Sequence, residues 1–346
     1  MRNVLPERNG DNVVEHLKLM QFCVRILTLA VPAGLAMGSL CAEDVLPPAQ
    51  VKIGGAVVDV KFAPGSINLG EGPVVAWITS AAEAVTEYFG RFPLPNPRIL
   101  VRPADGRDGV FHGTTYGFRG GFTRISVGQF TTQEELDYDW MMTHELLHLA
   151  FPDVAGDDRE HHWIEEGMAT YVEPIARCQI GRYPVERVWG DMCRYMPQGE
   201  PRDGDQGLDN THTWGRTYWG GALYWLMADI QIRQRTSNRK GLQDAMRAIL
   251  DAGGSLVNEW PIERVLQVGD QGTGTTVLAD LYRRMKDAPT EVDLNDLWGK
   301  LGIRVNNGVV SFNDKAPLAR IRKAITEPRK PELSEVRKRG GAEVGR

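Results

Sequence analysis

The sequence predicts an α+β fold, with a mixed α/β segment followed by a mainly helical one. Up to residue 127, several short segments are typical of strands. Beyond residue 152, longer segments have the periodicity of helices. The composition suits a folded globular chain, because 42% of the 346 residues are hydrophobic and 25% are charged.

Before residue 152 we expect strands around a single helix. Residues 57–62 alternate between apolar and polar like a strand, two further short segments also indicate strands, and the expected helix carries apolar residues at helical spacing. The expected strands are residues 57–62, 98–102 and 122–127, and the expected helix is residues 74–89.

Beyond residue 152 we expect mainly helices, at residues 214–235, 241–250, 277–285 and 294–301. Residues 303–312 are expected to form a hairpin with Asn306-Asn307-Gly308 as its turn, because Asn and Gly tolerate positive φ. Residues 196–213 are rich in Pro, Gly and Asp and indicate a loop. Its aspartates, Asp203, Asp205 and Asp209, lack the full pattern of a Ca²⁺-binding loop, so a solvated loop is expected.

The two ends of the chain are expected to lie outside the folded part. Lys18 and Arg25 precede an apolar run, residues 26–40, that is too short to span a bilayer comfortably and is typical of an export signal. We therefore expect residues 1–42 to be a signal peptide and the protein to be periplasmic or secreted. An uncleaved segment would instead anchor it in a membrane. Residues 327–346 predict a flexible charged tail. The folded part then divides into an α/β lobe, residues 43–155, and a mainly helical lobe, residues 156–326.

The net charge bears on the protein's partners, and the cysteines bear on a possible disulfide. The formal net charge of −5 argues against nucleic acid as the main partner. Two of the four cysteines fall in the expected signal, which leaves Cys178 and Cys193. In an exported protein these two are expected to form a disulfide, with two free thiols as the alternative.

The motif His144-Glu145-Leu146-Leu147-His148 indicates a metal site. It has the form H-E-x-x-H, in which histidines four apart share one face of a helix and can bind a single Zn²⁺. Glu145 is then placed to hold a water rather than the metal. The alternative is two histidines packed in the core of an amphipathic helix.

The flanking sequence predicts that this motif lies in one helix of about five turns. Thr132 and Glu135 have the spacing of a capping box at its start. Apolar residues continue at helical spacing to Phe151, and Pro152 ends the helix because proline cannot continue it.

A catalytic zinc ion needs a third protein ligand and one open position. A second helix is expected downstream, with Asp157 and Asp158 as candidate caps and Glu160 in its first turn. The short connection at residues 152–156 would let this helix fold back on the first. A carboxylate would then face the two imidazoles.

The second helix carries Trp163-Ile164-Glu165-Glu166-Gly167-Met168-Ala169, a W-x-x-E-G-x-A motif. Together with H-E-x-x-H, this motif resembles the gluzincin zinc metallopeptidases, and most closely the aminopeptidase N and glycyl aminopeptidase families. The resemblance implies that Glu166 is the third zinc ligand beside His144 and His148. Glu165 is the competing candidate for that ligand.

Tyr218 begins a Y-x-x-G-A motif that is similar to one in the same families. The resemblance implies that its hydroxyl binds the oxyanion formed during hydrolysis; the alternative is an ordinary packed aromatic. It also implies a thermolysin-like catalytic domain of two lobes with one catalytic Zn²⁺. The substrate would be a peptide or protein, with Glu145 as general base. Glu173 is a weaker candidate for a supporting role behind Glu166.

The chain departs from the family pattern in one place. These families carry a strand whose Glu grips the free amino group of the substrate, and residues 117–124 have the glycines of that strand but no Glu. Exopeptidase and endopeptidase activity therefore both stay open. The metzincin pattern is excluded, because Phe151 and Val154 stand where it requires Gly and His. The alternatives to a peptidase are a zinc protein that binds peptides without turnover and a metal-free structural protein.

Overall fold

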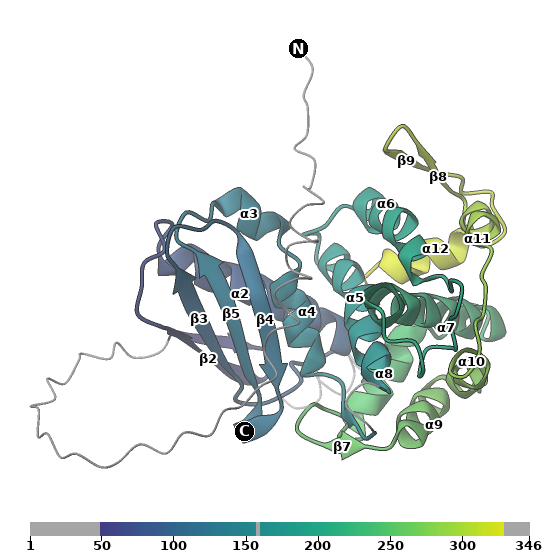
Figure 1. Ribbon diagram of the computed structural model, residues 1–346, viewed down its shortest axis with the longest axis horizontal. Coiled ribbons are helices and arrows are strands. Elements are labelled where there is room, and N and C mark those ends of the chain that lie inside the picture. The colour runs from purple at the N-terminus through teal and green to yellow at the C-terminus, as the bar shows by residue number, and fades with distance from the viewer. Residues whose placement is uncertain (1–48, 157–159, 329–346) are drawn as a thin grey trace, which may run out of the picture. The chain divides into compact units, whose positions relative to one another are not determined.

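The computed structural model describes residues 49–156 and 160–328 (Figure 1). The expected signal segment, the candidate caps Asp157 and Asp158 and nearly all of the expected tail lie outside these residues. In the described part of the chain, no helix is both long and apolar enough to cross a membrane.

The first part of the fold is a five-stranded sheet with strand order β1-β2-β3-β5-β4 (Figure 1). Neighbours β2–β3 and β3–β5 are parallel, whereas β1–β2 and β4–β5 are antiparallel, so the sheet is mixed. The strands are β1 (Ala49–Ile53), β2 (Ala56–Phe62), β3 (Arg98–Ala104), β4 (Val110–Tyr116) and β5 (Phe122–Gly128).

The predictions for β2, β3 and β5 are confirmed, but β1 and β4 were not predicted. Strand β4 could not be predicted from its sequence, VFHGTTY. A glycine and two threonines stand where a half-buried strand would have alternating apolar residues. Its pairing with β5 also shifts register between Phe111 and Thr114. Both unpredicted strands lie at the edges of the sheet, where burial does not impose an alternating pattern.

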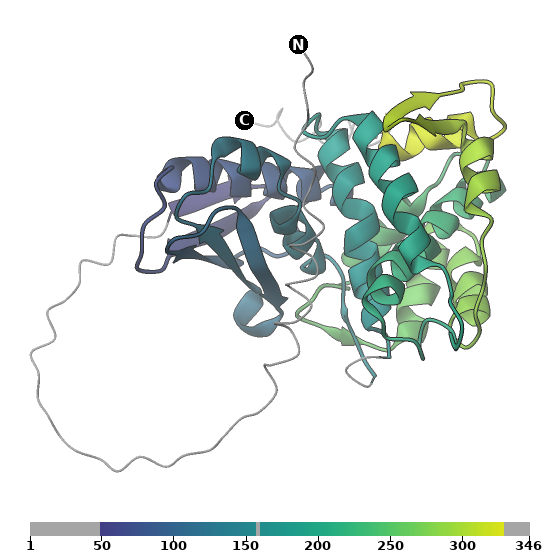
Figure 2. The same cartoon turned by 45° about the horizontal axis from the view of Figure 1, so that its top comes forward.

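The expected helix at residues 74–89 is confirmed as α2 (Glu71–Phe89), which packs against the sheet (Figure 2). Its apolar residues recur at helical spacing, among them Val74, Ile78 and Val85, and all three are fully buried. Gly90 ends the helix in the left-handed conformation, at a φ of 81°, which glycine adopts at little cost.

The helix expected to run about five turns through the H-E-x-x-H motif is two helices, α3 (Gln133–Tyr138) and α4 (Met141–His148). The capping box is confirmed, because Glu135 accepts from the Thr132 N–H while the Thr132 hydroxyl accepts from the Glu135 N–H. The prediction of one continuous helix is wrong because Asp139 adopts an extended conformation. Its carboxylate accepts from the Met142 N–H at 3.1 Å, so it starts a second helix.

The second part of the fold is mainly helical (Figure 1). The predictions for α7 and α8 are confirmed, and those for α10 and α11 are confirmed to the residue. Helices α6 and α9 were not predicted, and glycines inside both weaken the helical signal; α12 was also missed. The helices are α5 (His162–Gln179), α6 (Val185–Tyr195), α7 (Gly221–Arg235), α8 (Leu242–Asp251), α9 (Ile262–Thr273), α10 (Val277–Met285), α11 (Leu294–Leu301) and α12 (Ala319–Thr326).

Two short strand pairs lie outside the five-stranded sheet. Strands β6 (Asp153–Val154) and β7 (Glu259–Trp260) pair in parallel. The predicted hairpin is confirmed as β8 (Ile303–Asn306) and β9 (Val309–Phe312), and both turn residues have positive φ, 50° at Asn307 and 77° at Gly308.

Helix α5 begins later than its predicted caps imply. Its N-cap is His161, so Glu160 precedes the first turn and Glu165 is the acidic residue within it. The positive, N-terminal end of the helix dipole is therefore close to Glu165 rather than to Glu160.

The loop at residues 196–213 is less solvated than predicted. Asp205 forms a buried ion pair with Arg216, with 2.7 Å between Oδ2 and Nε. Asp209 accepts hydrogen bonds from the Trp163 indole at 2.7 Å and the Tyr282 hydroxyl at 2.8 Å. These contacts fasten the loop to α5 and α10, because an unpaired buried carboxylate would be costly.

The predicted disulfide is also absent. Cys178 and Cys193 are both free thiols, each partly buried. Burial raises the pKa of the Cys178 thiol to about 11 and that of Cys193 to about 12, so neither is a reactive thiolate at neutral pH.

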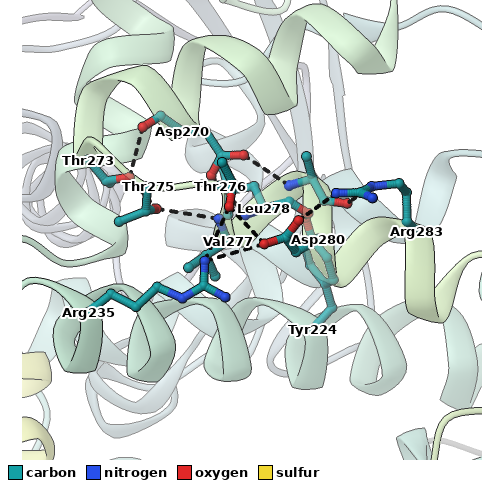
Figure 3. A network of polar contacts seen from close by, with 11 residues as sticks. Tyr224, Arg235, Asp270, Thr273, Thr275, Thr276, Val277, Leu278, Asp280 and Arg283 are labelled. Atoms are coloured by element: carbon teal, nitrogen blue, oxygen red, sulfur yellow. Dashed lines mark hydrogen bonds and ion pairs between the residues drawn. The ribbon is translucent and has the colours of Figure 1, made fainter.

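A polar network fixes the corner between α9 and α10 and ties it to α7 (Figure 3). Asp270 accepts from the N–H groups of Leu278 and Ala279, at 2.9 and 3.1 Å, and so satisfies the free amides at the start of α10. From α7, the buried Tyr224 hydroxyl donates to the Leu278 carbonyl at 2.9 Å. Arg235, at the end of α7, contacts Asp280. These hydrogen bonds fix the position of α7, the helix that follows Tyr218, relative to α10.

Candidate metal centre

Three side chains converge between α4 and α5. His144 and His148 lie one turn apart on α4, and Glu166 lies on α5. Glu166 Oε2 is 3.0 Å from His144 Nε2 and 3.7 Å from His148 Nε2. All three residues offer ligand atoms within 4.8 Å of one another. The structure therefore brings together the three residues that the sequence predicts as metal ligands.

This spacing fits a zinc ion. Zinc is bound by His nitrogen and carboxylate oxygen at about 2.0–2.2 Å, so tetrahedral geometry separates neighbouring ligand atoms by roughly 3.3 Å. The two observed separations lie on either side of that value. The donor set, two imidazoles and one carboxylate, is also a common set for catalytic zinc.

The protonation states of two ligands also suit a metal. Burial lowers the pKa of His148 to about 4, so this ring is neutral at pH 7 and has a free electron pair. Although burial alone raises the pKa of Glu166, His148 and His144, which are protonated at the low pH where this carboxyl titrates, lower it to about 2. Burial lowers the pKa of His144, but contact with Glu166 raises it above the usual value overall. A proton on His144 and a metal cation would therefore compete for the same carboxylate.

The other residues considered as ligands have different partners. Glu165, the competing candidate for the third ligand, accepts from the Val154 N–H at 3.0 Å. His161 contacts the Ala155 carbonyl and the Tyr282 hydroxyl. His162 is half-exposed and lies 3.5 Å from Glu166 Oε1, so it contacts the carboxylate from the outside.

Strand β4 holds the carboxylate of Glu145. The Thr115 hydroxyl lies 2.7 Å from Glu145 Oε2 and 3.0 Å from the hydroxyl of Thr123, so Thr123 can donate to Thr115 while Thr115 donates to Glu145. Gly113 leaves room for the same carboxylate, because a Cβ there would lie 2.6 Å from Glu145 Oε1. Burial raises the pKa of Glu145 to about 7, which suits a group that exchanges protons near neutral pH.

These contacts correct the prediction about the strand beside the zinc helix. Residues 122–124 belong to β5, which lies inside the sheet between β3 and β4. The edge strand that contacts α4 is instead β4, and it too has no acidic residue. Because no strand was predicted at β4, the roles of Gly113 and Thr115 were missed.

Tyr218 lies at the same site. It lies in a π-helical turn, Arg216–Gly220, directly before α7. Its ring stacks on that of His144, with centroids 6.3 Å apart. Burial and the charge of Glu166 raise the pKa of the Tyr218 hydroxyl, so the hydroxyl keeps its proton and can donate a hydrogen bond. The structure thus brings Tyr218 to the three candidate ligands.

Glycines within both helical motifs set the distance between α5 and α7. A Cβ at Gly167, which follows Glu166, would overlap the main chain of Gly221. A Cβ at Gly221 would overlap the Trp163 carbonyl oxygen. The two helices therefore meet backbone to backbone, close to Glu166 on one helix and to Tyr218, three residues before Gly221, on the other chain segment. Glycine is required because any side chain would separate the helices.

Glu173, the weaker candidate for a supporting role, lies two turns beyond Glu166 and is buried. It forms an ion pair with Arg177 on the same helix, with 2.8 Å between Oε1 and Nη1. Arg177 also donates to the Asp137 carbonyl at 2.9 Å, which connects α5 to the end of α3. The expectation of an exposed helix carboxylate as the alternative is therefore wrong.

The fold is similar to that of known metallopeptidase structures. An aminopeptidase N family protein from Idiomarina loihiensis matches with a TM-score of 0.56 and 14% identity, over 78% of this chain and 52% of that one. An M1 zinc metallopeptidase from Deinococcus radiodurans has a TM-score of 0.48 and 16% identity, over 72% and 53%. This chain thus spans about half the length of these structures. At such identities the likeness shows the fold alone. No protein-family model and no curated protein matches the sequence.

Proposed function

We propose that this protein is a zinc-dependent peptidase, with His144, His148 and Glu166 as metal ligands. The observation that carries the proposal is the convergence of their three ligand atoms beside the buried Glu145. Similarity of the fold to an aminopeptidase N family protein supports it. We also propose that the chain has an α/β lobe at residues 43–155, a helical lobe at residues 156–326, and a signal segment at residues 1–42 that exports it.

Each residue of the site has its own role in the proposed hydrolysis. Zinc held by the three ligands would polarise the scissile carbonyl and acidify the attacking water. Glu145 takes a proton from that water and passes it to the leaving amine, as base and then acid. Tyr218 donates a hydrogen bond to the carbonyl oxygen as negative charge develops there. Thr115 holds the Glu145 carboxylate in one orientation between these transfers.

The first test is metal-dependent cleavage of a peptide mixture. The purified protein is expected to contain about one zinc ion per chain, by elemental analysis, and to cleave peptides by mass spectrometry. A chelator should abolish cleavage and added zinc should restore it. The same digest separates exopeptidase from endopeptidase products. A metal-free protein that cleaves no peptide in the presence of added zinc would overturn the proposal.

Replacing Thr115 with valine should lower kcat roughly 10- to 100-fold, because a hydrogen bond to a charged group contributes about 1.5–3 kcal/mol. Zinc content and KM should change little, since Thr115 contacts neither the ligands nor, on this proposal, the substrate. Thr115→Ser keeps the hydroxyl and should restore most of kcat. Equal losses in the valine and serine variants would show that shape at this position matters rather than the hydrogen bond.

A further inference from the structure

The buried ion pair of Arg216 and Asp205 lies at the turn that carries Tyr218. The Arg216 side chain is 4% exposed and that of Asp205 is 2% exposed, with 2.7 Å between Nε and Oδ2. Arg216 also donates from Nη1 to the Gly199 carbonyl oxygen. The Asp205 carboxylate in turn accepts from the Gly207 N–H at 2.9 Å. One guanidinium therefore connects the first residue of the π-helical turn to two points of the preceding loop.

The end of the π-helical turn is held by the same groups. A Cβ at Gly199 would lie 2.2 Å from the Trp219 carbonyl carbon, so the two main chains are in direct contact. The Arg216 guanidinium lies against Gly220, because a Cβ there would be 3.2 Å from Nη1. Gly199 and Arg216 therefore contact the last two residues of the turn.

The hydrogen bonding of this turn is unusual. The Gly221 N–H bonds to the Arg216 carbonyl five residues back, whereas an α-helix uses the carbonyl four residues back. Turns of this kind are rare and occur frequently at functional sites. Because the wider turn changes the direction of its side chains relative to those of α7, the groups that hold the turn also set the direction of Tyr218.

The ion pair is explained better by geometry than by stability. A buried ion pair often contributes little net stability relative to apolar side chains, because both charges lose their hydration. We propose that Arg216 is a positioning residue for Tyr218. Through Gly199 and Asp205 it holds the turn in one arrangement, which directs the Tyr218 hydroxyl toward the metal centre. This inference rests on the proposed peptidase function, in which that hydroxyl donates to the carbonyl oxygen of the substrate.

The test is a double-mutant cycle, measured as kcat on a peptide identified in the first digest. Arg216→Met combined with Asp205→Asn leaves no unpaired buried charge, and the asparagine can still accept from Gly207. This paired variant should lower kcat roughly tenfold through a misplaced hydroxyl, with KM and zinc content unchanged. Tyr218→Phe should lower kcat by about 10²-fold or more. In the Tyr218→Phe background, the paired variant should lower kcat by less than about twofold, since no hydroxyl remains to be misplaced.

A second buried pair of Arg and Asp provides the matched control. Arg233 and Asp229 lie on α7, with 2.7 Å between Nε and Oδ1. Their other hydrogen bonds connect them to Tyr171, Asn238 and Leu242, which lie outside the π-helical turn. Arg233→Met combined with Asp229→Asn should therefore change kcat by the same small factor in both backgrounds.

Equal losses from the Arg216 paired variant in both backgrounds would overturn the positioning role, as would an unchanged kcat or a parallel loss of zinc. If that variant does not fold, Arg216→Lys should show the same coupling, because lysine keeps a charge beside Asp205 but has no second nitrogen for Gly199. A crystal structure of either variant separates the two proposals. A Tyr218 ring displaced from His144 supports the positioning role even if the wild type cleaves no peptide, which would contradict the peptidase alone. A ring still stacked at 6.3 Å, in an active wild-type enzyme, would contradict the positioning role alone.

Discussion

Replacement of Glu145 with glutamine is expected to lower the rate of peptide hydrolysis by about 10³-fold, within the range that general acid–base catalysis contributes. Glutamine has nearly the same shape but cannot take a proton from water. Its amide can still lie beside Thr115, in the space that Gly113 leaves. The three ligands remain in place, so zinc content and thermal stability should match those of the wild type. The measurement is kcat on a peptide identified in the first digest.

Glu134→Gln is the control for this variant, because it makes the same chemical change on the exposed face of α3. It should leave kcat unchanged. A Glu145→Gln variant that keeps a tenth or more of the wild-type rate would contradict the role of general base. If the wild type binds peptides and neither protein cleaves them, the alternative of a zinc-dependent binding protein gains support.

The candidate ligands were predictable because their signals are local. Two histidines four apart need only one helical turn to share a face, and this turn survives although the predicted long helix is broken at Asp139. Glu166 follows from the resemblance, and the return of α5 onto α4 brings it to the histidines. Short-range periodicity and a family motif were therefore enough to predict which residues meet.

The residues that surround the ligands were not predictable in the same way. Thr115 meets Glu145 across thirty residues of sequence, from a strand with no alternating pattern. The predicted disulfide was wrong because a spacing of fifteen residues does not determine how two side chains are oriented. Likewise, Asp205 and Asp209 lie in a segment whose composition is that of an ordinary loop. Only their buried partners show that they fasten this loop to the rest of the fold. Such contacts depend on packing between distant elements.

The glycine after Glu166 gives the second prediction with a large expected effect. Gly167→Ala should lower the free energy of unfolding by about 3 kcal/mol, at the upper end of the usual cost of overpacking. The added methyl group would overlap the main chain of Gly221, and backbone cannot rotate aside as a flexible side chain can. Activity should fall as well, because separation of α5 from α7 moves Glu166 away from Tyr218. Denaturant unfolding measures the first effect, and kcat with zinc content measures the second.

Gly299→Ala provides the matched control, because this glycine lies inside α11 with nothing within 4 Å of the position of its added Cβ. In a helix, alanine is favoured over glycine by about 0.5–1 kcal/mol, so this variant should be slightly more stable than the wild type. The same chemical change is thus expected to have opposite signs at the two positions. If Gly167→Ala were as stable and as active as the wild type, the close contact between α5 and α7 would not be what positions the metal ligand. The glycine in W-x-x-E-G-x-A would then need another explanation.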